Sequence, residues 1–241
     1  MKNQILNKLS LLIVAAILLT ACDKKKEDNS DKNLDAKKEE VSQEGTKKMI
    51  FENDYAKVLK VTLEPNESLA LHNGEERLIY SLSDYSINWT EEGNSGVKAW
   101  KEGDVHFHST GEHAAENTGS VTAEWLVFIK KEAELPDCGE NTLDNDVNSV
   151  ASDFAEKSFD NDMFRVTEVT LPVGESIPMH SGVNRMIYSL TDYKLIYESN
   201  IEEKGEKKFN TGDLHWHKAC SHALKNNGKT EAKFLVVAYK K

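Results

Sequence analysis

The chain has 241 residues, of which 29% are charged and 39% are hydrophobic, and its formal net charge is −11. This composition excludes a polytopic membrane protein, a collagen-like fibre and a wholly disordered chain. The acidic balance argues against a nucleic-acid partner, because phosphate contacts need a basic surface. Three cysteines are too few for a disulfide scaffold, and the length allows one large domain or two small ones.

The first 21 residues have the pattern of an export signal. Residues 1–8 carry two lysines and no acid, and residues 9–19 are almost wholly apolar but too few to span a bilayer as a helix. This run ends in Leu-Thr-Ala-Cys at Leu19–Cys22, which resembles the lipobox of bacterial lipoproteins. The resemblance implies cleavage before Cys22, lipidation of its thiol, and an exported protein anchored to the inner or outer membrane and facing the periplasm or cell surface. The alternative is an ordinary secretory signal with a chance cysteine.

Residues 22–48 form a polar segment in which Leu34, Ala36 and Val41 are isolated apolar residues. Such a segment buries too little apolar surface to offset the entropy of ordering. We therefore expect a disordered stretch, which serves either as a tether from the lipid anchor or as a solvated charge run with no task.

From Met49 onwards the chain repeats itself at a spacing of 108 residues, which one inserted residue later increases to 109. For example, Val61–Leu63 returns as Val169–Leu171 in the same order and with the same residue types. This internal duplication predicts two domains, at 49–132 and 152–241, with the polar segment 133–151 as a linker. The repeated set includes all eight histidines: His72, His106, His108 and His113 return as His180, His215, His217 and His222.

Each copy has the pattern of a small all-β domain. Short runs rich in β-branched and aromatic residues occupy 78–83 and 124–130, and they return at 186–191 and 233–240. Glycine, asparagine, aspartate and proline bound these runs, as they do in turns between strands. Many short strands in each copy predict a closed barrel or a sandwich.

The second half of each copy resembles the second sequence motif of the cupin family. That motif has a Gly-Asp strand, a glycine turn, a histidine, and then asparagine and glycine. The matching residues are Gly103-Asp104, Gly111, His113, Asn117 and Gly119 in copy one, and Gly212-Asp213, His222, Asn226 and Gly228 in copy two. Copy two departs at the turn, where Cys220 stands in place of Gly111.

The resemblance implies an all-β bicupin, with two tandem jelly-roll (double-stranded β-helix) barrels that each hold a ligand cavity. The first half of each copy resembles a degraded first cupin motif that keeps one histidine, His72 or His180. Cupins include dioxygenases, isomerases, metal-dependent hydrolases, storage proteins and sugar-binding regulators. The fold therefore does not decide the function.

The same resemblance makes His72 with His113, and His180 with His222, match two metal-binding histidines of cupins. The family also uses a second histidine two residues after the first, and then a glutamate. Here glycine stands at that histidine position, and arginine stands near the glutamate position: Gly74 and Arg77 in copy one, Gly182 and Arg185 in copy two. A guanidinium at this place disfavours a cation and favours a carboxylate or phosphate.

Further histidines could replace the missing ligands. His106 and His108 lie two residues apart on an expected strand and share one of its faces, as do His215 and His217. If that face points inward, the histidines could complete an imidazole site for a first-row metal, Zn, Fe, Cu, Mn or Ni. If it points outward, Phe107 and Trp216 fill the barrels instead.

Other candidate residues have two interpretations each. Arg77 and Arg185 either contact a ligand or form structural ion pairs. Tyr80 and Tyr188 are ligand-binding candidates, although aromatic residues at such positions more often pack in a core. Cys138 and Cys220 form a disulfide outside the cytoplasm if their geometry allows it, and are otherwise two free thiols.

Three functional hypotheses follow. The favoured one is a lipid-anchored bicupin that binds a small ligand, anionic or not, or a transition metal without turning it over. The second is a metal-dependent enzyme of the dioxygenase or isomerase type, and the third is a structural envelope protein with inactive barrels. Because cupins often pair through sheet edges, a homo-oligomer remains open, and the sequence does not identify the substrate.

Overall fold

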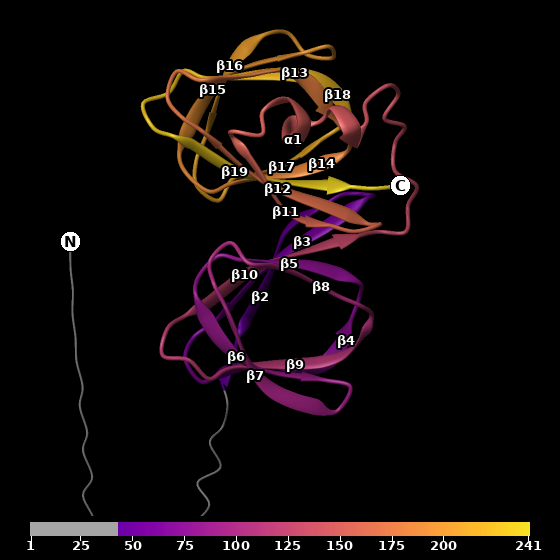
Figure 1. The fold of residues 1–241 in the computed structure, drawn as a ribbon. Coiled ribbons are helices and arrows are strands. Elements are labelled where there is room, and N and C mark those ends of the chain that lie inside the picture. The colour runs from indigo at the N-terminus through magenta and orange to yellow at the C-terminus, as the bar shows by residue number, and fades with distance from the viewer. Residues whose placement is uncertain (1–42) are drawn as a thin grey trace, which may run out of the picture. The chain divides into compact units, whose positions relative to one another are not determined.

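The computed structural model describes residues 43–241, and these residues form two all-β barrels in tandem. The first barrel is drawn in indigo to magenta and the second in orange to yellow in Figure 1. The predicted export signal, Cys22 and the predicted tether up to residue 42 lie outside the described residues. No helix within the described range is long and apolar enough to cross a membrane.

The first barrel consists of two five-stranded sheets, in the orders β1-β4-β9-β6-β7 and β2-β3-β10-β5-β8. Neighbouring strands run antiparallel, except that β1 is parallel to β4. The bounds are β1 Gln43–Glu44, β2 Thr46–Glu52, β3 Ala56–Leu63, β4 Glu67–Gly74, β5 Arg77–Ser81, β6 Tyr85–Glu91, β7 Asn94–Trp100, β8 Val105–His108, β9 Gly111–Asn117 and β10 Ala123–Lys130.

The second barrel repeats this topology without a counterpart of β1, and its sheets have the orders β11-β12-β19-β14-β17 and β13-β18-β15-β16. Its strands are β11 Ala155–Asp160, β12 Phe164–Leu171, β13 Ser176–Gly182, β14 Arg185–Ser189, β15 Tyr193–Ser199, β16 Gly205–Phe209, β17 Leu214–His217, β18 Cys220–Asn226 and β19 Ala232–Tyr239. Even the irregular register is duplicated, because β4 shifts just before His72 and β13 shifts just before His180. The predicted all-β fold with two jelly-roll barrels is confirmed.

Alternating side chains explain why these segments become strands. Along β6, Tyr85, Ile87 and Trp89 are buried in the interior of the first barrel, while the residues between them are partly exposed. The same alternation returns along β15. Each barrel therefore encloses an apolar interior built from the inward-facing residues of both of its sheets.

A third apolar core joins the two barrels. On β5, Leu78 and Tyr80 face this shared core, whereas Ile79 faces the interior of the first barrel. The shared core is formed by Ala56, Val58, Leu78, Tyr80, Leu126, Phe128 and Leu135 together with Phe164, Val166, Met186, Tyr188, Leu235, Val237 and Tyr239. A hydrogen bond from the Tyr80 hydroxyl to Glu168 Oε2, at 3.0 Å, also crosses between the barrels. The outer faces of two sheets are thereby covered.

Two predicted boundaries need correction. The tether does not extend to residue 48, because β1 begins at Gln43 and β2 at Thr46. The predicted linker 133–151 is not featureless, because it contains a 3-10 turn at Leu143–Asn145 and the short helix α1, Val147–Val150. These elements could not be predicted from their polar sequences, because each is stabilised mainly by contacts with the barrel beside it.

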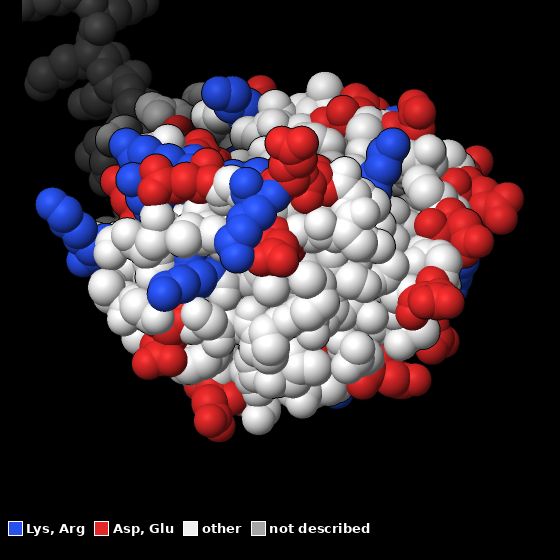
Figure 2. All heavy atoms as spheres, turned by 90° about the horizontal axis from the view of Figure 1, so that it is seen from above, with Lys and Arg blue, Asp and Glu red and all other residues white. Residues whose placement is uncertain are grey.

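The charged surface is mixed rather than basic. Figure 2, the view from above Figure 1, shows acidic side chains around much of the outline and lysine or arginine side chains interspersed with acids. A broad uncharged area lies between them on this face.

Truncating the shared core should destabilise both barrels together. Phe128 is fully buried there, and we expect Phe128→Ala to lower the free energy of unfolding by about 3–5 kcal/mol. Denaturant titration followed by both circular dichroism and tryptophan fluorescence measures this loss, and the two probes should coincide. Val97→Ala is the control, because Val97 is 67% exposed and its loss should change the free energy by less than about 0.5 kcal/mol. Separate transitions for the two probes would contradict a shared core.

Candidate functional site

Strand register brings two histidines face to face inside each barrel. His72 on β4 is the Cα partner of His113 on β9, and His180 on β13 is the partner of His222 on β18. Their ring centroids lie 4.2 Å apart in the first barrel and 4.1 Å apart in the second. Histidines that lie 41 and 42 residues apart in the sequence thus become neighbours because adjacent antiparallel strands carry them.

The histidine pairs on β8 and β17 also point inward. His106 is opposite Ile79, which packs inside the first barrel, and His108 is opposite Arg77. His108 lies 4.6 Å from the ring of Trp89, an interior residue. Phe107, between the two histidines, packs against the core shared by the barrels. The inward alternative is therefore correct for the first barrel.

The second barrel repeats this arrangement. His215 is opposite Ile187, His217 is opposite Arg185, and both histidines line the interior cavity. Trp216, the counterpart of Phe107, packs against the shared core. The inward alternative therefore holds in both barrels.

An arginine occupies the centre of each histidine group, at the place that the missing histidine would take. A Cβ built on Gly74 would lie 2.5 Å from Arg77 Nη1 and 2.5 Å from His113 Cε1. A Cβ on Gly182 would lie 2.4 Å from Arg185 Nη1. Glycine is required at these positions because the guanidinium already fills the space. Arg77 and Arg185 are each only 4% exposed.

Seven of the eight histidines have pKa values below the ordinary value for histidine. Burial, followed by the charge of Arg77, lowers the pKa of His113 to about 4, and burial lowers that of His106 to about 3. In the second barrel, burial and Arg185 lower the pKa of His215 to about 4 and of His217 to about 2. The pKa values of the remaining buried histidines, His108, His180 and His222, are also lowered, mainly by burial. Each site thus holds one cation next to neutral imidazoles, such as His113 in the first barrel and His217 in the second.

This arrangement does not fit the predicted first-row metal. Within residues 43–241, no three side chains of histidine, cysteine, aspartate or glutamate lie close enough together to hold an ion. The guanidinium that stands among the imidazoles would also repel a divalent cation at this position. The imidazoles are therefore available for hydrogen bonding rather than coordination, and anions are the complementary ligands.

The first barrel contains a cavity of about 280 Å3 beside Arg77. Its polar wall includes His72 and His113, and much of the remaining wall is apolar, with Trp89 and Trp125. Lys47 and Lys57 also line it, and Lys57 Nζ lies 2.6 Å from Glu75 Oε2. Three basic side chains and one acid thus surround a cavity in a chain whose net charge is −11.

Three buried polar atoms in the first barrel are left without hydrogen-bond partners. The Arg77 guanidinium donates from Nη1 to the carbonyl oxygens of Glu75 and Ser109, at 2.9 and 3.2 Å. Among the described residues, Arg77 Nη2, His106 Nδ1 and His108 Nε2 have no hydrogen-bond partner. His108 is 8% exposed. An unpartnered buried group costs about 1–3 kcal/mol, and more if it is charged, so a ligand that forms hydrogen bonds with these atoms would stabilise the barrel.

The second barrel satisfies its guanidinium from within. Arg185 Nη2 lies 3.6 Å from Cys220 Sγ and 3.3 Å from His222 Nε2. The Cys220 thiol also lies 3.4 Å from the hydroxyl of Tyr197, the counterpart of Trp89. The cavity here is about 70 Å3, a quarter of the volume in the first barrel. Cys220, which stands in place of Gly111, and His222 together give Arg185 Nη2 the partners that Arg77 Nη2 lacks.

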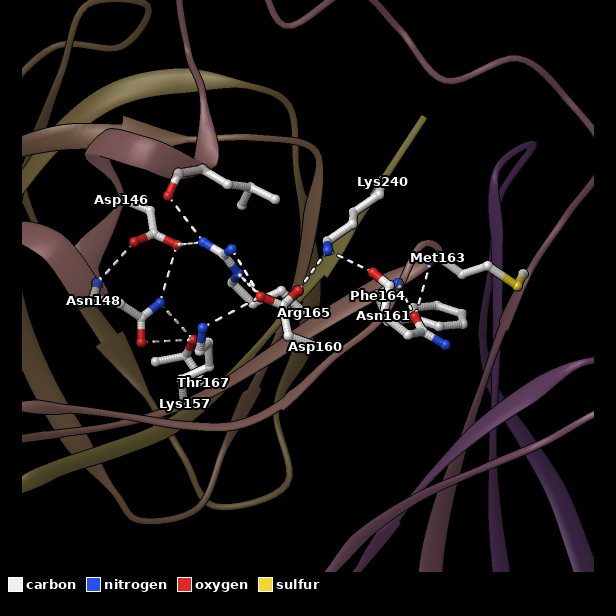
Figure 3. A network of polar contacts seen from close by, with 11 residues as sticks. Asp146, Asn148, Lys157, Asp160, Asn161, Met163, Phe164, Arg165, Thr167 and Lys240 are labelled. Atoms are coloured by element: carbon white, nitrogen blue, oxygen red, sulfur yellow. Dashed lines mark hydrogen bonds and ion pairs between the residues drawn. The ribbon is translucent and has the colours of Figure 1, made fainter.

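The linker covers the second barrel. Figure 3 shows Arg165 of β12 held between Asp146 and Asp160, with Nη1 at 3.0 Å from Asp146 Oδ2 and Nη2 at 2.8 Å from Asp160 Oδ2. Asp146 caps α1 by accepting from the backbone N–H of Asn148, and Val147 of α1 is buried. Asp146 and Val147 both line the cavity. Lys57 is the counterpart of Arg165 in the first barrel, but it pairs with Glu75 instead.

Three sequence-based interpretations are corrected here. Tyr80 and Tyr188 do not bind a ligand in these cavities, because strand alternation turns both into the core shared by the barrels. Cys138 and Cys220 are free thiols rather than a disulfide. Cys220 points into the barrel beside Arg185, whereas Cys138 Sγ lies 3.3 Å from Asn184 Nδ2. The arginines themselves form no ion pair closer than 4 Å with any described residue, so the structural ion-pair interpretation is also wrong.

Sequence reasoning missed Trp89 and Glu91. The Trp89 ring lies 4.6 Å from that of His108 and 5.0 Å from that of His113. Glu91 is the Cα partner of His113, and its carboxylate lies 3.4 Å from His108 Nδ1. The alternating pattern of β6, repeated 108 residues later, could have placed Trp89 inside the barrel. No motif marks Glu91, whose counterpart in the second barrel is Ser199.

Solved structures share this fold. AerE from Microcystis aeruginosa is 18% identical with a TM-score of 0.57, covering 82% of this chain and 98% of its own. A formate complex of Lactobacillus farciminis oxalate decarboxylase is 11% identical with a TM-score of 0.60, covering 83% of this chain and 82% of its own. Bacillus subtilis oxalate decarboxylase, which has Mn(II) centres, is 13% identical with a TM-score of 0.58, covering 83% of this chain and 74% of its own. No family model and no curated protein matches the sequence. The likenesses show that the chain has the fold of a bicupin.

The neutral histidines should make the protein sensitive to mild acid. Their folded-state pKa values lie below the ordinary value of about 6.5, so folding favours the uncharged form. The stability that they contribute is complete above about pH 6.5 and is lost as the pH falls toward 4. Each such histidine adds up to about 1.4 kcal/mol per pH unit to the slope of the unfolding free energy in that range. Denaturant titrations at pH 7.5, 6.0 and 5.0 measure the slope.

His113→Gln is the matched variant for this slope, because glutamine cannot take up the proton. We expect a shallower loss of stability between pH 7.5 and 5.0 than in the parent protein. Equal slopes in the two proteins would show that His113 is not held neutral by the fold.

Proposed function

We propose that this protein is an exported, lipid-anchored bicupin that binds a small carboxylate in its first barrel. The observation that carries the proposal is Arg77 Nη2, a buried cationic donor without a partner, in a barrel with a cavity of about 280 Å3. A carboxylate is the natural partner of a guanidinium, because its two oxygens accept from the planar fork. The lipobox at Leu19–Cys22 supports export and anchoring.

The cavity favours an organic anion over an inorganic one. Apolar and aromatic side chains form much of its wall, among them Leu59, Ile79, Trp89 and Trp125. Burying a carbon skeleton against these side chains contributes about 25 cal/mol per Å2 of apolar surface. The volume lies just below the roughly 300–1,000 Å3 that is common for drug-sized ligands, so a smaller acid fits.

The second barrel has a supporting role in this proposal. Its guanidinium is already engaged by Cys220 and His222, and its cavity is small and is lined in part by α1. The barrel also supplies half of the apolar core that joins the two domains. Binding rather than turnover is favoured, because each site places a fixed cation where standard cupin chemistry needs a metal.

Removing the first guanidinium should weaken binding, whereas removing the second should not. We expect Arg77→Gln to weaken binding of 4-methylpentanoate and of its 2-hydroxy derivative by about 10–100-fold, because a charge-assisted hydrogen bond is lost. Arg185→Gln is the matched control and should leave both affinities within about twofold. Isothermal titration calorimetry of the full chain measures the affinities. Equal losses in the two variants, or no binding by the parent protein, would refute the proposal.

Copying the cysteine into the first barrel should block the site without removing its charge. A Cβ at Gly111 would meet no atom within 4 Å, so Gly111→Cys can be accommodated. The thiol should then engage Arg77 as Cys220 engages Arg185, and both acids should bind at least about tenfold more weakly. Gly111→Ala adds a side chain without the sulfur and is the control. Unchanged binding in Gly111→Cys would show that Cys220 is not what closes the second site.

A further inference from the structure

Three imidazoles in the first barrel present an acceptor nitrogen rather than a donor. His72 Nδ1 lies 2.8 Å from the carbonyl oxygen of Ala70, and His113 Nδ1 lies 3.5 Å from that of Gly111. A carbonyl oxygen can only accept, so Nδ1 carries the proton in both rings. In a neutral imidazole the other nitrogen, Nε2, is then a hydrogen-bond acceptor.

His108 also carries its proton on Nδ1, but the partner of that nitrogen is a carboxylate rather than a backbone carbonyl. Its Nδ1 lies 3.4 Å from Glu91 Oε1, and a carboxylate likewise only accepts. Its Nε2 is therefore an acceptor, and it is the atom that is buried without a partner among the described residues. The carboxylate of Glu91 accepts from Trp89 Nε1 as well, at 3.3 Å, so it is already engaged.

The cavity of the first barrel thus places one cationic donor, Arg77, beside two of these imidazoles, His72 and His113. Arg77 Nη1 and His113 Cε1 both lie 2.5 Å from the point where a Cβ of Gly74 would stand, so the guanidinium and the imidazole are adjacent. A plain carboxylate or phosphate would satisfy the guanidinium but would leave the imidazole acceptors unpaired. A ligand that satisfies both carries a hydrogen-bond donor on the carbon beside its carboxylate.

A hydroxyl suits this position better than an ammonium group. The charged side chains that line the cavity are Lys47, Lys57, Arg77 and Glu75, and Glu75 is paired with Lys57. An ammonium group would add a further cation where no acid is free to receive it. A hydroxyl donates to an imidazole without adding charge.

We propose that the first barrel binds a 2-hydroxycarboxylate with a short apolar chain. Its carboxylate accepts from Arg77 Nη2, its hydroxyl donates to an imidazole Nε2, and its chain packs on Trp89 and Trp125. This inference rests on the proposed function, since it takes the same site and specifies the ligand class. No bond is made or broken, so the ligand is held rather than converted.

Three acids with one carbon skeleton test the inference. Isothermal titration calorimetry of the full chain compares 2-hydroxy-4-methylpentanoate, 4-methylpentanoate and leucine, which differ only at carbon 2. We expect the hydroxy acid to bind about tenfold more tightly than the unsubstituted acid, the ratio that one hydrogen bond supplies. Leucine should bind most weakly of the three, because its ammonium group meets a basic cavity.

The outcomes separate this inference from the proposed function. Equal affinities for the hydroxy acid and the unsubstituted acid, both lost in Arg77→Gln, would overturn the ligand class and leave carboxylate binding in place. Tightest binding by leucine would also overturn it. If none of the three binds, both the proposed function and the inference fail.

A pair of variants gives a second readout on the acceptor. His72→Phe keeps an aromatic ring but removes Nε2 from the cavity wall, and we expect it to reduce the preference for the hydroxyl while plain carboxylate binding is retained. His180→Phe, its counterpart in the second barrel, should leave the preference unchanged. A preference that is unchanged in His72→Phe and lost in His113→Phe would assign the hydroxyl to His113. A preference that survives in both, and in the corresponding His108→Phe, would refute an imidazole acceptor.

Discussion

A buried guanidinium determines the interior chemistry of each barrel. Arg77 and Arg185 open the strand that carries the shared core on its other face, so their side chains are fixed in place by packing on both sides. A buried charge demands partners, and each arginine finds them in backbone carbonyls at the barrel end. The same charge, together with burial, keeps the surrounding imidazoles neutral. The histidines that the cupin resemblance assigns to metal binding are therefore available for hydrogen bonding instead.

Duplication has produced two sites that share their geometry but differ in the hydrogen-bond partners available to the guanidinium group. The histidine pairs, the arginines and the glycines that admit them superpose residue for residue in the sequence. At the turn, Cys220 replaces Gly111, and together with His222 it gives Arg185 Nη2 the partners that Arg77 Nη2 lacks. The linker helix adds to this difference, because it contributes to the cavity wall of the second barrel. A chain with two copies can thus keep one as a rigid neighbour and leave the other free to bind.

The fold was largely predictable from the sequence. For the site, the sequence predicted which residue types take part but not how they are arranged. Alternating hydrophobic runs between turn residues specify strands, and the repeat specifies two equivalent barrels. Sequence order could not decide which face of β8 points inward, because histidine and Phe107 are both acceptable inside a barrel. It could not reveal that Tyr80 packs between the barrels, because that interface exists only once both have folded. Glu91 was missed because its role arises from a cross-strand neighbour.

By itself the sequence determined the duplication, the all-β class and the set of histidines and arginines that would form the sites, and it predicted an export signal. These follow from local patterns, which depend on residue type and spacing along the chain. The tertiary structure decided which of these side chains meet, which stay neutral and which of two equivalent arginines keeps a donor atom, Nη2, without a hydrogen-bond partner. Those properties depend on register, burial and the space left between strands, and none of them is local in the sequence.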